Sequence, residues 1–557
     1  MSKLMTLREA IAQHVKPGDT VALEGFTHLI PFAAGHEIIR QGITDLTLVR
    51  MTPDVVYDML IGAGCAKKLV FSWGGNPGVG SLHRFRDAVE KQWPVPLEVE
   101  EHSHAGMVTR FQAAASGLPF GTLRGYSGTD LAKVTPNIKF VQCPFTGESL
   151  AAVPAIELDV TVIHAQQADK DGNIGTWGIS GVQKEAVLAA KHVIVTVEEI
   201  VEEFDPRVRQ VLPAWTVDAI AVVPRGAHPS YAMNYYVRDN AAYLAWDPIA
   251  RDRDTFQTWI REHILETQDF AEYLAKIGLD NPVLDGPGSA GLAEQTDLAL
   301  VDFDAPATAD EIMTVVASRE LPDETVCFVG IGLPSVAANL ARRTHAPQAV
   351  LVYESGTIGA KPTVPPLSIG DGELAETADA LVGSPEIFAY WLQAGRIDVG
   401  FLGAAQLDRF GNINTTVVGN YDHPKVRLPG AGGAPEIATS AGQTFVMLRQ
   451  SPKAFVERLD FITSVGHLEG GDARAQLGLP GAGPTVVITD IGVMRPDPQT
   501  HELVLTQLHP GRTVEEAIAA TGWALKVSPN VTTTELPTTE ELRQLRMLTR
   551  PKAKAHA

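Results

Sequence analysis

One ten-residue pattern occurs twice in this chain, and it constrains the fold more than any other feature of the sequence. The pattern A-x-Q-x-D-x-x-G-N-I spans residues 165–174 (AQQADKDGNI) and residues 404–413 (AAQLDRFGNI). Each copy follows an apolar run, and Asp and Gly-Asn are typical of tight turns. We therefore expect a strand followed by a turn at both places. Because the pattern recurs at a constant offset, the chain is predicted to consist of two related halves.

A turn-rich segment lies between the two halves. Residues 277–309 contain several Gly and Pro residues and show only weak periodicity, which is typical of a linker. Apolar residues have helical spacing before it, in residues 256–278, and again after it, in residues 311–321. The predicted organisation is a first domain over residues 1–276, a linker over 277–309 and a second domain over 310–548.

Short runs rich in Val, Ile and Leu alternate with helical segments in each half. This order is typical of βαβ units, in which parallel strands are buried between layers of helices. We predict an α/β fold with two related, doubly wound open-sheet domains. The predicted strands lie at residues 20–26, 46–51, 68–73, 159–165 and 192–197 in the first half, and at residues 325–332, 349–354, 398–404, 444–449 and 484–490 in the second.

The composition restricts the partners of the chain. Its 557 residues carry a formal net charge of −21, which argues against nucleic acid because binding to a phosphate backbone needs a basic surface. No run of about 18 uncharged apolar residues offers a membrane-spanning helix. Residues 1–15 read as an amphipathic helix, and Arg8 and Glu9 interrupt the apolar core that a signal peptide needs. We expect a cytoplasmic protein that is not attached to a membrane.

The three cysteines also point to a reducing compartment. Cys65, Cys143 and Cys327 are widely separated and odd in number, so they form neither a disulfide framework nor a metal-ligand spacing. We expect all three to be small residues of the core.

The segment 349–362, AVLVYESGTIGAKP, carries the strongest functional signal in the sequence. A short apolar run ends on Glu354 and is followed at once by a glycine-rich turn. A buried parallel strand delivers its last residue to the edge of the sheet where ligands bind. A carboxylate at that edge can act as a nucleophile.

A second glycine-rich loop leaves a different enzyme class open. Gly330 and Gly332 follow a predicted strand and precede a helix, and Glu354 lies some two dozen residues further on. This arrangement imitates a dinucleotide-binding fingerprint. It departs from that fingerprint at Pro334, which stiffens the loop, and at Ser335, where Gly or Ala is usual. A nicotinamide-dependent dehydrogenase therefore stays as an alternative.

A polar cluster lies near residue 100. Glu100, Glu101, His102 and His104 could act as metal ligands or as an acid and base pair, and on a strand the two histidines would share a face. No third ligand is marked by its spacing, so no metal site is predicted. We expect these side chains to line a polar cleft that faces the other half, where His104 contacts the substrate.

Several segments resemble the class I coenzyme A transferases. In the second half, residues 328–335 (FVGIGLPS), 352–356 (VYESG) and 428–438 (LPGAGGAPEIA) resemble the β subunit, whose nucleophile is a glutamate in a Ser-Glu-Asn-Gly-like turn. In the first half, residues 18–31 (GDTVALEGFTHLIP) and 159–174 resemble the α subunit. The resemblance covers nearly the whole chain outside the linker. It implies a natural fusion of an α and a β subunit.

The resemblance also implies a reaction. Glu354 would attack an acyl-CoA, and a glutamyl-CoA thioester would then pass CoA to a second acid with ping-pong kinetics. Within the family the segments are most similar to members that use succinyl-CoA as donor and 3-oxoadipate as acceptor. CoA is then a substrate and a covalent intermediate, no cofactor is tightly bound, and the fused chains are expected to form a homodimer.

The remaining site residues follow from the same resemblance. Glycine permits close approach to backbone N–H groups, and the turn around residue 430 is expected to contact CoA or an oxyanion. Gly430, Gly432 and Gly433 are assigned to that turn, whereas Gly25, Phe26, Ser72, Asn76 and His104 are assigned to the substrate. For Ser72 and Asn76, a purely structural role in a turn explains the sequence equally well.

The sequence departs from the family pattern at three places. Tyr353 and Ser355 flank Glu354 where Ser and Asn are usual, and Glu24 precedes Gly25 where the family has a second glycine. Two alternatives of the same fold remain. A CoA-thioester hydrolase would use water as acceptor, although such family members lack the β-side glutamate, and a CoA-binding protein without catalysis is also open.

Overall fold

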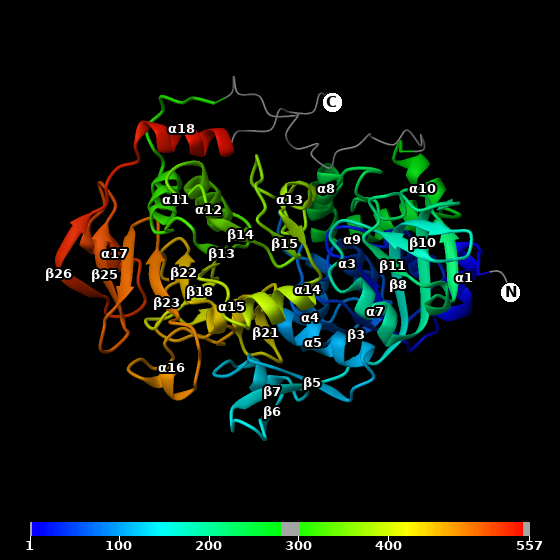
Figure 1. Ribbon diagram of the computed structural model, residues 1–557, viewed down its shortest axis with the longest axis horizontal. Coiled ribbons are helices and arrows are strands. Elements are labelled where there is room, and N and C mark those ends of the chain that lie inside the picture. The colour runs from blue at the N-terminus through cyan, green and yellow to red at the C-terminus, as the bar shows by residue number, and fades with distance from the viewer. Residues whose placement is uncertain (1–2, 280–300, 550–557) are drawn as a thin grey trace.

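The computed structural model describes residues 3–279 and 301–549. Figure 1 shows the first half, coloured blue to green, beside the second half, coloured yellowish green to red. Most of the predicted linker lies outside the described residues, between α10 (Phe270–Lys276) and α11 (Ala309–Arg319).

The first half is built on a largely parallel sheet with β1 and β8 at its centre. Its strand order is β11-β9-β8-β1-β2-β3-β4, and β10 and β12 continue it from the other edge of β8. The strands are β1 (Thr20–Glu24), β2 (Leu46–Val49), β3 (Ala66–Phe71), β4 (Glu98–Glu101), β8 (Leu158–Asp169), β9 (Ile174–Thr176), β10 (Ala190–Val201), β11 (Gln210–Leu212) and β12 (Ala219–Val222).

The second half is built on a longer sheet of the same kind. Its strand order is β16-β15-β14-β13-β17-β22-β23-β24-β25-β26. The strands are β13 (Val326–Phe328), β14 (Val350–Val352), β15 (Thr357–Ile358), β16 (Ala380–Leu381), β17 (Val399–Leu402), β22 (Gln443–Met447), β23 (Pro484–Ile488), β24 (Gly492–Pro496), β25 (Leu503–Leu508) and β26 (Lys526–Thr533).

Each sheet has four parallel strands at its centre, and these strands have the same order in both sheets. This confirms the predicted α/β fold with two related open-sheet halves. In the first half β2, β1, β8 and β10 are neighbours and run parallel. In the second half β14, β13, β17 and β22 have the same order and direction. The strand that carries Glu354 therefore has its counterpart in β2.

The repeated ten-residue pattern forms the same turn twice, as predicted. In the first copy Asp169 Oδ1 accepts from the N–H groups of Asp171 and Asn173, and β8 turns back into β9. In the second copy Asp408 Oδ1 accepts from the N–H groups of Phe410 and Asn412, and β18 (Gln406–Leu407) turns back into β19 (Ile413–Asn414). An Asp that satisfies the backbone of its own turn is the common physical cause.

Helices cover both faces of each sheet, because alternate residues of a strand point to opposite faces. Val21 and Leu23 of β1 pack beneath one layer of helices, and Ala22 belongs to the core on the other face. The helices are α1 (Leu7–His14), α2 (Phe32–Arg40), α3 (Val55–Gly62), α4 (His83–Lys91), α5 (His104–Ala115), α7 (Gln183–Ala189), α8 (Asn240–Arg251) and α9 (Arg253–Ile260) in the first half, and α12 (Leu333–Arg343), α13 (Gly372–Thr377), α14 (Ser384–Glu386), α15 (Ala434–Ser440), α16 (Ala473–Gln476), α17 (Val514–Ala519) and α18 (Thr539–Leu548) in the second.

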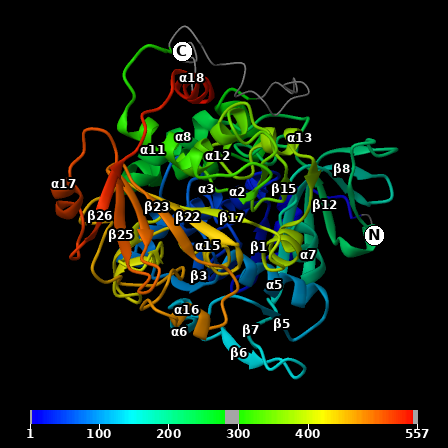
Figure 2. The same cartoon turned by 60° about the vertical axis from the view of Figure 1, so that its left-hand side comes forward.

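One hydrophobic core runs through both halves. Ala22 and Val49 of the first sheet belong to the same buried cluster as Phe328 and Val352 of the second. Each large apolar side chain of this kind contributes about 1.5–3 kcal/mol by leaving water. Figure 2 shows the two halves in contact along this inner side, with α5, α7 and α15 near the junction. The halves therefore fold against each other rather than standing apart.

The sequence missed several elements at the periphery. A small antiparallel sheet of β5 (Phe120–Leu123), β7 (Ser149–Pro154) and β6 (Lys139–Gln142) projects at the bottom of Figure 1. Its strands are short and partly exposed, so their pattern is weak. The helical segment predicted at residues 256–278 is interrupted by a π-helical turn at Arg261–Leu265, and Asp269 caps a new helix after it.

The cysteines follow the prediction in part. Cys65 and Cys327 are buried, as predicted, and all three thiols are free. The prediction was wrong for Cys143, which is only partly buried because it lies at the end of the peripheral hairpin of β6 and β7. No helix in the described part of the chain combines the length and the hydropathy needed to cross a lipid bilayer.

A buried ion pair joins the halves beneath their shared core. Glu101 ends β4, Arg427 ends β21 (Pro424–Arg427), and both side chains have no solvent exposure. Glu101 also accepts a hydrogen bond from the Thr416 hydroxyl at 3.0 Å, and the Arg427 guanidinium lies 5.3 Å from the ring centre of Phe71. Two charges removed from water are tolerated because each neutralises the other.

We expect Glu101→Gln to lower the free energy of unfolding by about 3–5 kcal/mol, because it leaves the Arg427 charge buried and unpaired. Urea denaturation followed by tryptophan fluorescence would measure the change. Glu98→Gln is the matched control, since Glu98 is 67% exposed in its contact with Lys68 and its loss should cost only about 0–1 kcal/mol. Equal effects of the two substitutions would contradict the argument.

Candidate active site

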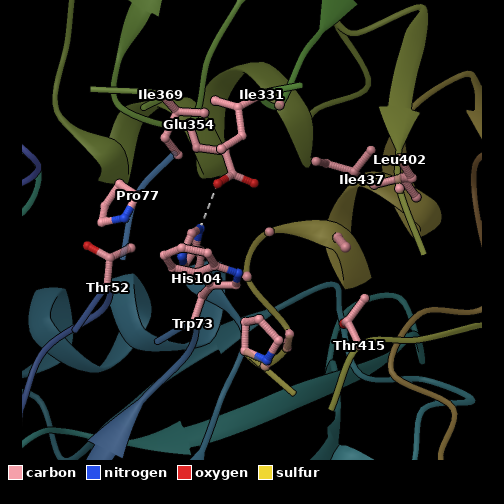
Figure 3. Close-up of a pocket in the computed structure, with 18 of the residues that line it drawn as sticks. Thr52, Trp73, Pro77, His104, Ile331, Glu354, Ile369, Leu402, Thr415 and Ile437 are labelled. Atoms are coloured by element: carbon pink, nitrogen blue, oxygen red, sulfur yellow. Dashed lines mark ion pairs between the residues drawn. The ribbon is translucent and has the colours of Figure 1, made fainter. Parts of the chain in front are cut away.

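A cavity of about 460 Å³ lies where the two halves meet, and both halves line it. Figure 3 shows Thr52, Trp73, Pro77 and His104 from the first half facing Ile331, Glu354, Ile369, Leu402, Thr415 and Ile437 from the second. The walls are mainly apolar, and a few polar groups converge on Glu354. Ligand sites of enzymes commonly have this composition.

Glu354 reaches the cavity from a tight hairpin. Strand β14 ends at Val352, the Gly356 N–H donates to the Tyr353 carbonyl at 3.0 Å, and the chain returns as β15. Gly356 has a φ of +105°, and a Cβ there would meet the Val382 carbonyl oxygen at 1.8 Å. Only glycine fits this turn. The turn holds Glu354 at the sheet edge with its side chain 13% exposed.

His104 faces Glu354 from the other half. Its Nδ1 lies 3.0 Å from Glu354 Oε2, as the dashed line in Figure 3 marks, although the geometry is not that of a hydrogen bond. The ring is held edge-on by Phe26 and by Phe388, with ring centres 6.4 and 5.8 Å away. The imidazole is therefore fixed beside the carboxylate that the sequence marked as a nucleophile.

The glycine turn predicted around residue 430 also lies against Glu354. A Cβ on Gly433 would be 2.3 Å from Glu354 Oε1, so only a glycine leaves room for the carboxylate. The backbone of Gly432 is tied to the first half, since its carbonyl accepts from the His104 N–H at 2.8 Å. Gly430, Gly432 and Gly433 all line the cavity.

The residues that line the cavity also include a buried charged group. Arg50 lies just past β2, where its guanidinium donates to Asp54 Oδ1 at 3.1 Å and to the Gly25 carbonyl at 2.7 Å. Its Nε has no hydrogen-bond acceptor among the described residues. Burial raises the pKa of nearby Glu24 to about 7, and the Arg50 charge opposes that rise. Arg50 and Asp54 line the cavity.

Three of the predicted substrate residues do not line the cavity. Gly25 lies behind it, where its own carbonyl holds Arg50. The Ser72 hydroxyl donates to the Gly432 carbonyl at 3.3 Å, and the Asn76 amide donates to the Tyr243 carbonyl at 2.8 Å. Both side chains are buried and engaged with the main chain, so the structural interpretation of this turn applies. Phe26 and His104 do line the cavity.

The expected polar cleft near residue 100 was only partly right. The two histidines do not share the face of a strand, because β4 ends at Glu101 and His104 begins α5. Glu100 pairs with Arg110 and His102 away from the cavity. Among residues 3–279 and 301–549, no group of three His, Cys, Asp or Glu side chains could hold a metal ion.

The departures around Glu354 have a simple geometric explanation. Tyr353 points to the opposite side of the strand, where it is fully buried and its hydroxyl lies 3.2 Å from Ser335 Oγ. It therefore does not touch the cavity. Ser355 is also buried, and its Oγ has no hydrogen-bond partner in the described part of the chain. The tyrosine that stands in place of the usual serine therefore lies outside the part of the cavity that surrounds the carboxylate.

Sequence reasoning missed Arg50, Thr52 and Trp73, which line the cavity. A signal was present for the first two. Because β2 is the counterpart of β14, residues just after β2 must reach the same edge of their sheet as Glu354 reaches in the other half. Trp73 follows β3 in the same way.

The comparisons with known proteins agree with this geometry. A family model described as coenzyme A transferase matches residues 4–222 and 310–520. The chain belongs to the coenzyme A transferase family. It is an enzyme that transfers CoA, and the dehydrogenase alternative built on Gly330 and Gly332 is dropped.

Relatives of this CoA-transferase correspond to its two halves. The 3-oxoadipate CoA-transferase of Pseudomonas knackmussii has two separate subunits. One of them is 67% identical over 278 residues, which cover 50% of this chain and 99% of that relative. The other is 63% identical over 249 residues, which cover 45% of this chain and 96% of that relative. The fusion that the sequence implied is thereby confirmed.

A solved structure shows the same fold over the full length. The acyl-CoA transferase YdiF of Escherichia coli O157:H7 matches 99% of this chain and 96% of its own, with a TM-score of 0.68 and 16% identity. At this identity the likeness concerns the fold alone. It shows that both halves of a CoA-transferase can be arranged in one chain as they are here.

We expect Gly433→Ala to reduce CoA transfer by about 100-fold, because the added methyl group would displace the Glu354 carboxylate and a shift of about 1 Å has that effect on a reacting group. Initial rates and thermal unfolding would be measured together. Gly80→Ala is the control, since its Cβ would meet no atom within 4 Å. Full activity of Gly433→Ala would show that the close contact is unimportant.

Proposed function

We propose that this CoA-transferase moves CoA from succinyl-CoA to 3-oxoadipate through a glutamyl-CoA thioester on Glu354. The observation that carries the proposal is the position of Glu354, a partly exposed carboxylate held at the junction of the halves in an apolar cavity. The substrate pair is supported by the two 3-oxoadipate CoA-transferase subunits that resemble the halves.

A carboxylate is the nucleophile that this chemistry needs. Transfer without an external energy source must keep the acyl group activated at every step. Glu354 attacks the donor thioester, and the bond to sulfur breaks to give a mixed anhydride and the CoA thiolate. The thiolate then attacks the glutamyl carbonyl, the donor acid leaves as a carboxylate, and the glutamyl-CoA thioester remains. The acceptor carboxylate reverses these steps, so atoms and charge balance.

In the proposed reaction, the groups next to Glu354 stabilise the oxyanions that form in these steps. Each tetrahedral intermediate needs a preorganised donor in a site that excludes water. The Gly433 backbone lies against one carboxylate oxygen, and His104 Nδ1 lies against the other. In this mechanism the Gly433 N–H stabilises the oxyanion on the glutamyl carbon, and His104 orients the carboxylate for attack.

Arg50 supplies the recognition of a second carboxylate. The 3-oxoadipate acceptor and the succinyl group both carry a carboxylate at the end that does not react. Arg50 places a guanidinium in the cavity wall, held by Asp54 and Gly25 and with one N–H still without an acceptor in the described residues. An arginine fixed in this way favours a dicarboxylic substrate, because charge-assisted hydrogen bonds are the stronger ones.

We expect Glu354→Gln to abolish both turnover and the covalent intermediate. The enzyme would be incubated with succinyl-CoA and no acceptor, and the peptide containing residue 354 would be examined by mass spectrometry for the thioester-linked CoA. Glu203→Gln, at an exposed position, should leave the adduct and the rate unchanged. Intersecting rather than parallel lines in two-substrate kinetics would rule out the ping-pong route.

The same experiment distinguishes a CoA-transferase from a CoA-thioester hydrolase. A CoA-thioester hydrolase would release free CoA continuously from succinyl-CoA without an acceptor, whereas the transferase stops once Glu354 is occupied. A CoA-binding protein without catalysis would show neither product nor adduct.

We expect Arg50→Lys to change the choice of acceptor. The ratio of kcat/KM for 3-oxoadipate to kcat/KM for a 3-oxo monocarboxylic acid of equal chain length should fall by about 10- to 100-fold, because a charge-assisted hydrogen bond is worth about 1.5–3 kcal/mol and lysine does not reproduce the fixed planar guanidinium. Using a ratio cancels any general loss of stability. An unchanged ratio would mean that Arg50 does not bind the far carboxylate.

Two further expectations remain predictions. A homodimer of fused chains is expected because paired αβ units commonly double by symmetry. The cytoplasmic location is expected from the cysteines.

A further inference from the structure

A second carboxyl group is buried close to the nucleophile. Glu436 lies in the first turn of α15, just after the glycine turn that contacts Glu354, and it is 2% exposed. Its Oε1 accepts a hydrogen bond from the Ser103 hydroxyl at 2.6 Å. Its Oε2 is buried and has no hydrogen-bond partner in the described parts of the chain. The mechanism described above does not use this group.

Ser103 connects Glu436 to the other half of the site. It is the N-cap of α5, where its Oγ accepts from the Gly106 N–H at 3.1 Å. The next residue, His104, begins the helix, donates its N–H to the Gly432 carbonyl and presents its ring to Glu354. The start of α5 is thus fastened to α15 at two points, through Glu436 and through Gly432.

The surroundings of Glu436 disfavour a negative charge. The Glu354 carboxylate of the second half adds to the pKa of Glu436, and in the first half the Ser103 N–H donates to the Tyr126 hydroxyl at 3.0 Å. The nearby cations are engaged elsewhere. Arg110 pairs with Glu100, and the Arg474 guanidinium donates to the Ala438 carbonyl at the other end of α15.

Burial in this setting keeps the carboxyl group protonated at neutral pH. Loss of hydration raises the pKa of Glu436 to about 8, and the charge of Glu354 adds to the rise, while the Ser103 hydroxyl and backbone N–H groups oppose it. A neutral carboxyl group can remain beside Glu354, whereas a second carboxylate would repel the negative charge that develops there.

We propose that Glu436 is a positioning residue that acts in its protonated form, as a neutral link between α5 and α15 that holds His104 and the Gly433 backbone on either side of Glu354. The proposal rests on the function proposed above. It adds a residue that does not itself line the cavity and that acts through Ser103 and through the turn that precedes it.

The proposal predicts a loss of activity at alkaline pH. Ionisation of Glu436 would place a charge without a counterion behind the site, push α5 and α15 apart and oppose oxyanion formation. We expect kcat of the wild-type enzyme to fall above about pH 8. In Glu436→Gln, which keeps an acceptor for Ser103 and cannot ionise, kcat at pH 7 should stay within about threefold and the alkaline fall should disappear.

Three variants test the link itself. Glu436→Ala should reduce kcat by about 10-fold at every pH with little change in KM, since about 1.4 kcal/mol of positioning corresponds to that factor. Ser103→Ala should behave alike, and the double variant should be no worse than either single one. Tyr126→Phe is the control for the pH profile, because burial raises the pKa of Tyr126 above its usual range.

Stability gives a readout that does not depend on turnover. The folded enzyme keeps the Glu436 proton up to about pH 8, while the unfolded chain releases it near the ordinary value of 4.5. The free energy of unfolding of the wild type therefore falls as pH rises between these values. The Glu436→Gln variant lacks this contribution, so its stability relative to the wild type should increase over the same range.

The outcomes are distinct. An alkaline fall that persists unchanged in Glu436→Gln, or additive losses in the double variant, would overturn the proposal. If the wild type forms no CoA adduct on Glu354, the function proposed above fails, whatever Glu436 does. If the adduct forms at the same rate in all variants and at all pH values, the function stands and the role of Glu436 is rejected.

Discussion

The ion pair between Glu101 and Arg427 is the contact on which the geometry of the site depends. One charge comes from each half, neither touches water, and each can be buried only because the other is present. The pair fixes the end of β4 relative to the strand that precedes the glycine turn. His104 and that turn lie immediately beyond these two residues in the sequence, so an error in their pairing would separate Glu354 from both neighbours.

The two halves have the same arrangement of central strands, and they differ in the side chains that follow equivalent strands. The two sheets share their parallel centre, so each half brings the ends of equivalent strands to one edge. After β14 the chain carries Glu354, the proposed nucleophile, in a hairpin closed by Gly356. After β2 it carries Arg50, held by Asp54. In the proposed mechanism, reaction and recognition are thus divided between two copies of one arrangement, and both copies line a single cavity.

The sequence was sufficient for the central strands, for the repeated turn and for the position of Glu354 at the sheet edge, because each of these depends on a local pattern. The alternation of Val-rich runs sets the parallel sheets, and Asp169 and Asp408 satisfy the backbone of their own turns. Placing the other side chains required knowledge of contacts between the halves. Ser72 and Asn76 have the residue types of a substrate site, yet nearby carbonyl groups engage them.

The surroundings of Glu436 also could not be predicted from the sequence. In the sequence it is one acidic residue in the first turn of a helix, where a charge is ordinarily favourable. Its burial and its bond to Ser103 come from a helix more than three hundred residues away in the chain, and no local pattern reveals them. The peripheral sheet of β5, β6 and β7 was missed for a different reason, since its exposed strands carry little hydrophobic alternation.

Because both halves belong to one polypeptide, assembly of the cavity is an intramolecular event. In relatives made of separate chains, dilution favours dissociation, and unequal synthesis leaves some chains without a partner. Here the effective concentration of each half at the surface of the other is set by covalent connection and does not change with the amount of enzyme in solution. Every molecule that folds therefore carries Glu354 and Arg50 in fixed stoichiometry, even at very low abundance.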